Sequence, residues 1–376
     1  MKVRNLRSFT AQLLAPADVV LDGDRPWDIQ VHSDEMFQRL FRQGSLGLGE
    51  AYMDGLWDAV ALDVFFDRVL RAGLERKVRP WVVRLAEWRA RLVNLQTPLR
   101  AHEVAEVHYD LGNAFFETML DPRLVYSCGY WRDATTLAEA QTAKLALVSQ
   151  KLGLQPGMRV LDIGCGWGSS AHFMAERYGV AVVGLTVSTP QAEYARERCA
   201  GLPVEIRVQD YRETTGAYDA IVSVGMFEHV GSKNYRTYME VVERCLAGDG
   251  LCLLHTLGKL DSREVVDPWI ERYIFPNSEL PAMTQLATAL EGLLVIEDIE
   301  NIGADYDPTL MAWYANFERA WPQFSAQYGE RFHRMWRYYL LSCAGAARAR
   351  AIQVWQVVLS RRGLSGGYRR PTIEPG

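Results

Sequence analysis

Three alternate glycines in the middle of the chain are the residues whose spacing most clearly suggests chemistry. Gly164, Gly166 and Gly168 follow the largely apolar stretch 159–163, which predicts a strand, and precede residues 169–178, which predict a helix. Glycine lets the chain turn tightly and lets a ligand approach the backbone closely. Such a ligand would lie at the carboxyl end of a strand and beside a helix N-terminus. A corner in which the glycines serve packing alone would not require so many of them.

The spacing of these glycines indicates which ligand they bind. Dinucleotide-binding loops have the pattern G-x-G-x-x-G, with an acidic residue about 20 positions further on. Here the pattern is G-x-G-x-G, and the next predicted strand, 180–185, ends in Thr186, Val187 and Ser188 without a carboxylate. The pattern therefore favours S-adenosylmethionine over a nicotinamide. The neutral oxygens of Thr186, Ser188 and Gln191 could bind the ribose hydroxyls.

Polar residues also end the strand predicted after that one. Gln209, Asp210 and Tyr211 place a carboxylate and an aromatic ring where the adenine of such a ligand could lie. Asp210 has an alternative interpretation as the N-cap of a helix.

The elements that position these residues alternate from about residue 137 onward. Helices are predicted at 137–152, 169–178 and 235–246, and strands at 159–163, 180–186, 203–209, 219–225, 251–257, 293–299 and 353–360. Alternation of this kind predicts an α/β fold with a doubly wound, Rossmann-like parallel sheet.

The first part of the chain has a different pattern. Residues 1–60 predict a smaller α+β unit, with a helix near 36–42 and turns at 22–26 and 44–49, followed by a helix at 62–70. After Pro80, a helix is expected in which Trp81, Leu85, Trp88 and Leu92 share one face. Such a helix either lies in a membrane interface or packs inside a domain, and the pattern leaves both interpretations open.

Charge and composition narrow the function classes. The net charge is −5, yet residues 68–100 hold nine Lys and Arg (68, 71, 76, 77, 79, 84, 89, 91, 100) against two acidic residues (75, 87). A basic region of this kind suggests lipid head groups or nucleic acid, and no zinc-finger spacing or RNA-binding signature supports nucleic acid. The six cysteines form no C-x-x-C pair, which favours a reduced compartment and no metal site. No apolar run of about 18 residues is present, so we expect any membrane contact to be peripheral.

Together with the glycine loop, a series of motifs resembles the cyclopropane-fatty-acyl-phospholipid synthases, a family of S-adenosylmethionine-dependent methyltransferases that includes mycolic acid cyclopropane synthases. The similarity is strongest from about residue 108 to residue 360. The motifs are Tyr126-Ser127-Cys128-Gly129-Tyr130-Trp131, Thr186-Val187-Ser188, Gln209-Asp210-Tyr211, Gly225-Met226-Phe227-Glu228-His229-Val230-Gly231, Leu254-His255-Thr256, Asp267-Pro268-Trp269-Ile270, Tyr273-Ile274-Phe275-Pro276 and Gly303-Ala304-Asp305-Tyr306.

The resemblance implies a division of the chain and a reaction. It implies a lipid- or membrane-binding domain at 1–105, a linker at 106–125 and a catalytic methyltransferase domain at 126–376. The reaction would transfer a methylene group from S-adenosylmethionine to the cis double bond of an unsaturated phospholipid acyl chain. It further implies a cytoplasmic enzyme, peripherally associated with the inner face of the cytoplasmic membrane, and a possible homodimer.

The resemblance also implies two sets of site residues. The cofactor would be bound by Tyr126, Ser127, Asp162, Gly164, Gly166, Trp167, Gly168, Thr186, Ser188, Gln191, Gln209, Asp210 and Tyr211. A bicarbonate ion that serves as the base would be held by Cys128, Glu228, His255, the backbone of Leu257, and Tyr306.

Each residue of the bicarbonate set has an ordinary alternative. A lone cysteine is more often a small buried residue, a glutamate at a strand end can cap a helix, and a histidine in an apolar strand is usually a hydrogen-bonded core residue. As a set, Cys128, Glu228, His255 and Tyr306 fall at strand ends or connections, where doubly wound sheets bind ligands. Our hypothesis is that Glu228 and His255 relay the abstracted proton away from bicarbonate, while Tyr306 orients the anion.

Three other functions remain possible from the sequence alone. One is a related lipid methyltransferase that makes methylene or methyl-branched chains. In such an enzyme a carboxylate at position 225 could replace bicarbonate. This chain has Gly225, which leaves that space open and mildly favours cyclopropanation. The second is a small-molecule methyltransferase of the same fold, and the third is a lipid-binding protein without catalysis. The last two do not need the bicarbonate set.

Overall fold

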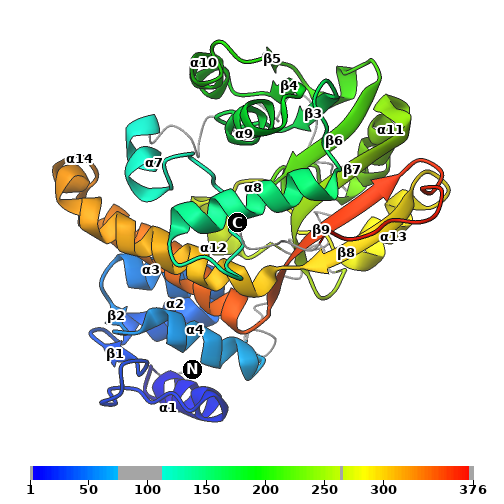
Figure 1. Ribbon diagram of the computed structural model, residues 1–376. Helices are drawn as coiled ribbons and strands as arrows, with labels where there is room; N and C mark the ends of the chain where they lie inside the picture. The colour runs from blue at the N-terminus through cyan, green and yellow to red at the C-terminus, as the bar shows by residue number, and fades with distance from the viewer. Residues whose placement is uncertain (1–2, 75–111, 263–265, 372–376) are drawn as a thin grey trace. The chain divides into compact units, whose positions relative to one another are not determined.

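The strands predicted between residues 159 and 360 form one seven-stranded sheet in the computed structural model, which describes residues 3–74, 112–262 and 266–371. The strand order is β5-β4-β3-β6-β7-β9-β8 (Figure 1). The strands are β3 (Arg159–Ile163), β4 (Ala181–Thr186), β5 (Val204–Val208), β6 (Tyr218–Val224), β7 (Leu246–Lys259), β8 (Val295–Asn301) and β9 (Ile352–Ser360).

The sheet is mostly parallel, as predicted, and includes an antiparallel pair at one edge. β5, β4, β3, β6 and β7 pair in parallel in that order. β8 and β9 pair antiparallel at one edge of the sheet. The chain between these two strands forms the helical segment α14 (Tyr306–Arg348), which is interrupted at Gly329, where φ and ψ are 71° and 170°.

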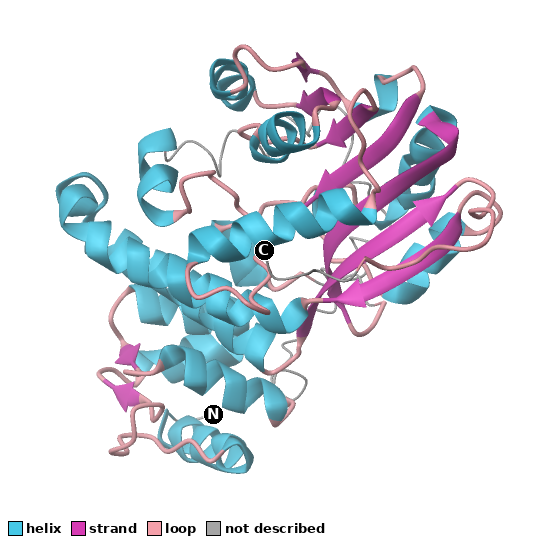
Figure 2. Ribbon diagram, in the orientation of Figure 1, coloured by secondary structure: helices cyan, strands magenta, loops and turns pink. Residues whose placement is uncertain are grey.

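Helices cover both faces of the sheet (Figure 2). α8 (Leu137–Lys151) and α9 (Ser169–Tyr178) bury apolar side chains against one face of β3, β4 and β6. α11 (Tyr235–Cys245) and α13 (Met283–Leu290) pack against the other face. α10 (Thr189–Arg198) packs against Ile206 of β5, and α7 (Asn113–Met119) precedes α8 in the chain.

The chain divides into two compact units that interleave along the sequence. The sheet unit comprises residues 95–263, 277–305 and 353–376, and the helical unit comprises residues 1–94, 264–276 and 306–352. The division expected from the sequence was into consecutive segments. The units interleave because α14 packs with α3 (Ser45–Met53) and α4 (Leu62–Arg71), and α12 (Pro268–Tyr273) packs with α3.

The helical unit contains less β-structure than the sequence suggested. Its strands are β1 (Gln30–Val31) and β2 (Trp57–Asp58), which form one short antiparallel pair. Its remaining described helices include α1 (Val3–Leu14) and α2 (Glu35–Gln43). Within this unit, Arg348 bridges Asp63 of α4 and Asp307 of α14, at 2.7 and 2.8 Å.

One predicted turn is wrong. The run 44–49, read as a turn because of its glycines, is helical from Ser45. Two of those glycines allow close packing instead, since a Cβ at Gly47 would lie 2.1 Å from the Arg39 carbonyl oxygen and one at Gly49 would lie 2.3 Å from the Trp269 ring. Such clearances exclude any larger residue, so glycine here serves helix packing.

Some expectations from the sequence concern residues that the structure does not describe, and others concern the cysteines, metal sites and membrane-spanning helices. The helix expected at 81–92 and most of the basic segment lie outside the described residues. All six cysteines are free thiols, and no cluster of three metal-ligating side chains occurs within the described ranges. Among the helices of the described residues, none is long and apolar enough to span a membrane.

Candidate active site

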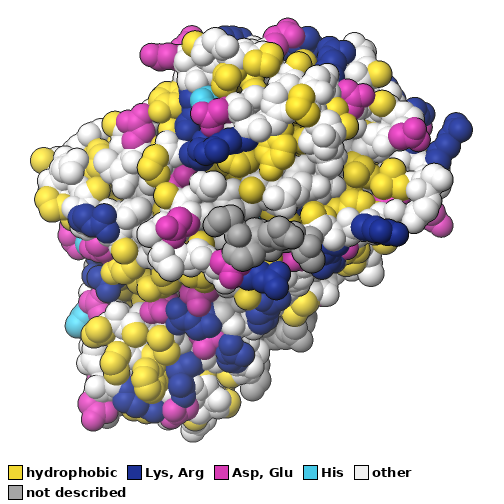
Figure 3. All heavy atoms as spheres, in the orientation of Figure 1, with side chains coloured by type: hydrophobic (Ala, Val, Ile, Leu, Met, Phe, Trp, Pro, Cys, Tyr) yellow, Lys and Arg dark blue, Asp and Glu magenta, His cyan; other side chains and the backbone are white. Residues whose placement is uncertain are grey.

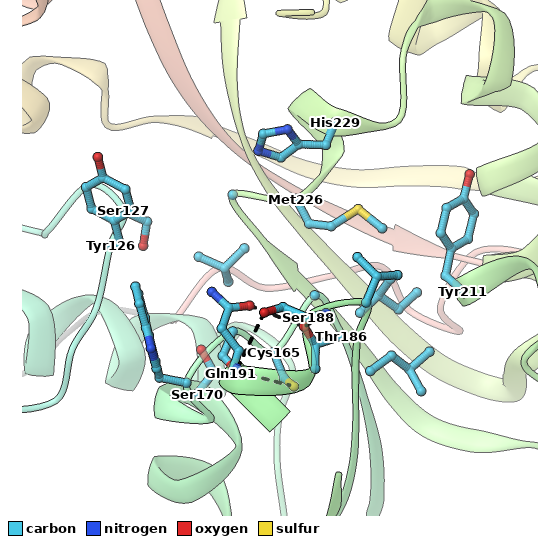
Figure 4. A pocket seen from close by; sticks show the side chains of 18 of the residues that line it. Tyr126, Ser127, Cys165, Ser170, Thr186, Ser188, Gln191, Tyr211, Met226 and His229 are labelled. Carbon is cyan, nitrogen blue, oxygen red and sulfur yellow. Dashed lines mark hydrogen bonds between the residues drawn. The ribbon is translucent and has the colours of Figure 1, made fainter. Parts of the chain in front are cut away.

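A cavity of about 220 Å³ lies at the carboxyl ends of β3, β4, β5 and β6. The strand order reverses between β3 and β6, and this is where doubly wound sheets bind ligands. The lining includes every predicted cofactor residue except Asp162 and Gly168, namely Tyr126, Ser127, Gly164, Gly166, Trp167, Thr186, Ser188, Gln191, Gln209, Asp210 and Tyr211. Figure 4 shows the labelled members of this set around the cavity.

The glycine loop needs glycine for two separate reasons. Gly164, Gly166 and Gly168 have φ angles of 88°, 52° and 78°, a region that favours glycine. A Cβ at Gly164 would also lie 2.6 Å from the side chain of Met226. The loop therefore holds a backbone shape that other residues would disturb.

Asp162 and Gly168 support the loop from outside the lining. Gly168 precedes α9, and a Cβ there would lie 3.0 Å from Ala195 of α10, so it lets the two helices approach closely. Asp162 is buried on β3, and this burial raises the pKa of its carboxyl group to about 7, although the charge of Lys144 acts in the opposite direction.

Neutral oxygens gather at the end of β4, as predicted. Thr186 Oγ1 donates to Gln191 Oε1 at 3.2 Å and accepts from the backbone N–H of Ser188 at 3.2 Å. Ser188 Oγ caps α10 by accepting from the backbone N–H of Gln191 at 3.4 Å. These bonds fix the three side chains around one corner of the cavity (Figure 4).

Asp210 combines both interpretations given to it. Its carboxylate accepts from the backbone N–H of Arg212 at 2.9 Å, which makes it the N-cap of the short helix Tyr211–Glu213. It also pairs with the Arg212 guanidinium at 2.8 Å while lining the cavity. The neighbouring ring of Tyr211 is buried and supplies an aromatic wall.

The segment before α8 brings Tyr126 and Ser127 to the cavity. Asp121 accepts from the backbone N–H groups of Arg123 and Val125 at 3.1 and 2.9 Å, and Leu124 between them has φ 55°. These contacts fix the turn that leads into residues 126 and 127.

Lys144 of α8 is a cavity residue that the sequence analysis missed. Its Nζ donates to Ser127 Oγ at 2.9 Å, and complete burial lowers the pKa of its ammonium group to about 8. The signal in the sequence was that Gln141, Lys144 and Lys151 fall on a helix face that is otherwise apolar, and all three are buried.

The structure brings part of the predicted bicarbonate set together in the sheet unit. Glu228, in a short helix after β6, accepts at Oε1 from the backbone N–H of Leu257 at 2.6 Å. Within the described ranges, no hydrogen-bond partner lies near its other oxygen, Oε2, which is buried. The backbone of Leu257, which was expected to hold the anion, thus donates its N–H to Glu228 in this structure.

His255 lies two residues before Leu257 on β7. Its carbonyl oxygen accepts from the backbone N–H of Gly225, a cavity residue, at 3.0 Å. A Cβ at Gly225 would have only Ser127 within 4 Å, so the space expected there is present.

Burial shifts the two titratable groups in opposite directions. It raises the pKa of Glu228 to about 7, and it lowers the pKa of His255 well below its usual value, assisted by the charges of Lys144 and Lys151. His255 is therefore neutral near pH 7.

The remaining two members lie in different units. Cys128, in the sheet unit, is buried with its thiol 3.3 Å from the carbonyl oxygen of Gly129 and 3.8 Å from that of Ile302. Tyr306 begins α14 in the helical unit, where its ring packs edge-on against Trp313.

His229 also lines the cavity, although the sequence analysis treated it only as the neighbour of Glu228. Burial lowers the pKa of this histidine to about 4, so it is neutral at physiological pH. Figure 4 places it with Met226 on one side of the cavity.

The fold and the glycine-loop cavity define an S-adenosylmethionine-dependent methyltransferase of the doubly wound class. Comparison with known proteins refines this class. The model of the family described as mycolic acid cyclopropane synthetase matches residues 96–357. The chain belongs to this family.

Relatives in sequence and in structure agree with that assignment. The chain is 54% identical over 361 residues to a cyclopropane-fatty-acyl-phospholipid synthase of Escherichia coli, covering 95% of this chain and 94% of the relative. It is 35% identical to cyclopropane mycolic acid synthase 1 of Mycobacterium tuberculosis, covering 67% and 94% of the two chains. The structure of a mycolic acid cyclopropane synthase complexed with SAH and CTAB aligns with TM-score 0.65 at 34% identity, covering 69% of this chain and 98% of that one.

Proposed function

We propose that this enzyme converts the cis double bond of an unsaturated phospholipid acyl chain into a cyclopropane ring, with S-adenosylmethionine as methylene donor. The observation that carries the proposal is the 54% identity to the Escherichia coli synthase, which extends over 95% of this chain and 94% of that enzyme. The similarity includes the helical unit as well as the sheet unit.

The polar and apolar groups that line the cavity suit S-adenosylmethionine. Thr186, Ser188 and Gln191 would bind the ribose hydroxyls, and Asp210 and Tyr211 would face the adenine. The glycine loop, Tyr126 and Ser127 would surround the methionine portion. Gly225, which also lines the cavity, would then be one of the residues left to face the reacting part of the substrate.

The proposed chemistry needs an aligned donor and a base. The π electrons of the alkene form a bond to the methyl carbon while the carbon–sulfur bond breaks, which leaves S-adenosylhomocysteine and a carbocation on the acyl chain. Loss of a proton from the transferred methyl group then closes the ring. Close alignment of the reactants supplies much of the rate, and exclusion of water protects the cation.

We further propose that bicarbonate supplies the base when it is bound. The residues present fit this ion, because a buried carboxyl oxygen of Glu228 has no partner among the described residues, and the pKa of that group is raised to about 7. A protonated Glu228 could donate to an anion, whereas an ionised one would repel it. Cys128 and the neutral ring of His255 would add weak donors, and Tyr306 would orient the ion.

Access to lipid would come from peripheral binding at the inner face of the cytoplasmic membrane. The basic segment 68–100 is the favoured contact, since each charge near an anionic surface contributes about 1 kcal/mol. The second candidate, the C-terminal arginines, is weaker. Arg361 pairs with Glu243 at 2.6 Å and Arg370 pairs with Asp298 at 2.9 Å, which leaves Arg362 and Arg369 exposed. On the face in Figure 3, Lys and Arg side chains lie among Asp and Glu side chains.

A homodimer is part of the same proposal, and the mass of the enzyme in sedimentation-velocity experiments tests it. The reaction itself is tested by incubating the enzyme with S-adenosylmethionine and vesicles of unsaturated phospholipid, followed by mass spectrometry of the acyl chains. We expect a gain of one CH₂ with loss of the alkene. Chains that gain CH₂ but keep a double bond would indicate a methylene product, and unmodified chains would contradict the proposal.

A further inference from the structure

A chain of buried polar side chains connects His255 to the outer strands of the sheet. It runs from His255 on β7 through Gln356 on β9 and Lys151 on α8 to Glu300 on β8. Gln356 and the Lys151 side chain are completely buried, and the His255 side chain is nearly so. Buried polar groups in proteins are nearly always hydrogen-bonded, and each of these side chains has a hydrogen-bonding partner within the series.

The strand pattern places these groups on one face of the sheet. Side chains two residues apart share a face, so His255 points the same way as Leu253, and Gln356 the same way as Val358. Leu253 and Val358 pack in one core cluster with Val148 of α8. β7 and β9 are neighbours, and Lys151 follows Val148 by one helical turn. The series of hydrogen-bonded side chains therefore lies between α8 and the sheet.

The donors in this chain determine its direction. Lys151 Nζ pairs with the Glu300 carboxylate and donates to Gln356 Oε1 at 2.9 Å. An ammonium group can only donate, so the amide oxygen of Gln356 must face Lys151. The amide nitrogen, Nε2, consequently faces His255 Nδ1 at 3.3 Å, and an amide nitrogen also only donates. His255 Nδ1 must accept.

We propose that Gln356, Lys151 and Glu300 are positioning residues that hold the neutral His255 ring in the tautomer protonated at Nε2. The ring then presents an N–H donor rather than a lone pair on its far side. Insofar as it concerns an anion, the inference rests on the proposed function. In that setting His255 donates to the bound ion and does not take up the abstracted proton, so the relay expected between Glu228 and His255 does not pass through the His255 ring.

The variant Gln356→Glu should reverse the donor and acceptor in the hydrogen bond between residue 356 and His255. A carboxylate accepts from Lys151 and from His255, so Nδ1 would become the protonated nitrogen and Nε2 would carry the lone pair. The matched control is Gln353→Glu on the same strand, whose side chain is also buried and contacts Asn301 at 2.6 Å instead of His255.

The test is ¹⁵N NMR of the enzyme labelled in its seven histidines, with the His255 signals assigned by their loss in His255→Gln. Protonated and unprotonated nitrogens of a neutral imidazole give well-separated signals. We expect Nδ1 unprotonated and Nε2 protonated in the wild type and in Gln353→Glu, and the reverse in Gln356→Glu. A wild-type ring protonated at Nδ1, or an even mixture, would overturn the proposal, even if Gln356→Glu failed to fold.

A second readout separates this inference from the proposed function. In bicarbonate-depleted buffer we expect Gln356→Glu to need at least about tenfold more bicarbonate for half-maximal turnover, with unchanged S-adenosylmethionine affinity, because a hydrogen bond to a charged group is lost. An unchanged bicarbonate requirement despite a reversed tautomer would overturn the donor role. If wild-type turnover did not depend on the bicarbonate concentration, bicarbonate would not be the base. The assignment of the His255 tautomer would be unaffected by that result.

Discussion

Glu228 and His255 illustrate how burial shifts the pKa values of two side chains that we propose to hold an anion. Removing each group from water disfavours its charged form, which raises the pKa of the carboxyl and lowers that of the imidazole. Near pH 7 the histidine is neutral, and the glutamic acid keeps its proton to a higher pH than an exposed glutamic acid does. An additional negative charge is therefore tolerated beside them, which would not hold if Glu228 were fully ionised.

The role of Glu228 is tested by Glu228→Gln. The amide keeps the size and one acceptor for the Leu257 N–H but cannot exchange a proton. We expect turnover to fall by about 100-fold or more, in the range of general acid–base contributions, with S-adenosylmethionine affinity unchanged by isothermal titration. The exposed Glu193→Gln is the control, and full activity in Glu228→Gln would remove this residue from the relay.

The raised pKa of Glu228 also predicts that Glu228→Gln changes the stability of the protein by an amount that depends on pH. The carboxyl pKa is about 7 when folded against about 4.5 when unfolded, so its contribution to folding is fully present at low pH and is lost as pH rises through about 7. Glu228→Gln should therefore stabilise the protein relative to the wild type by about 2 kcal/mol more at pH 8 than at pH 5. Urea denaturation at both pH values measures this difference, and an equal effect at both would show that the carboxyl pKa is not raised.

At the scale of elements, the site depends on the shape of the loop between β3 and α9. Gly164→Ala adds a Cβ at φ 88° and 2.6 Å from the Met226 side chain. We expect S-adenosylmethionine binding to weaken by about tenfold, since the left-handed strain alone costs about 1–2 kcal/mol. Gly248→Ala, whose Cβ meets nothing within 4 Å, is the control. Calorimetric titration would contradict the account if both variants bound equally well.

The local patterns of the sequence were enough to predict most of the sheet unit. Every predicted strand after residue 159 is present, because alternating apolar runs and helices leave few other arrangements. The cofactor residues at the ends of β3, β4 and β5 follow from the same topology.

What the sequence could not predict depends on contacts between distant segments. The glycines at 47 and 49 look like turn residues until Trp269 and the Arg39 carbonyl are known to lie against them. α14 continues across Pro322, a residue type that usually ends a helix, and is interrupted only at Gly329, where φ and ψ are 71° and 170°. Lys151 and Gln356 are 205 positions apart, so no local pattern indicates that they meet.

At the scale of the whole molecule, the proposed reaction requires the enzyme to reach a bilayer. If the basic segment makes that contact, replacing Arg84, Arg89 and Arg91 together with Gln should reduce partitioning onto anionic vesicles by about 3 kcal/mol at low salt. Replacing Arg362 and Arg369 should have the smaller effect. Sedimentation with vesicles measures both, with S-adenosylmethionine affinity as the control for folding. A larger loss of vesicle binding on replacing Arg362 and Arg369 would show that the C-terminal arginines make the membrane contact instead.

Ring closure is tested most directly by following the transferred carbon with S-adenosylmethionine that carries a CD₃ methyl group. Cyclopropanation removes one hydrogen from that methyl group, so we predict acyl chains that gain CD₂, lose the double bond and resist hydrogenation under mild conditions. Chains that retain all three deuterium atoms would show methyl branching. They would contradict ring closure and with it the need for a base.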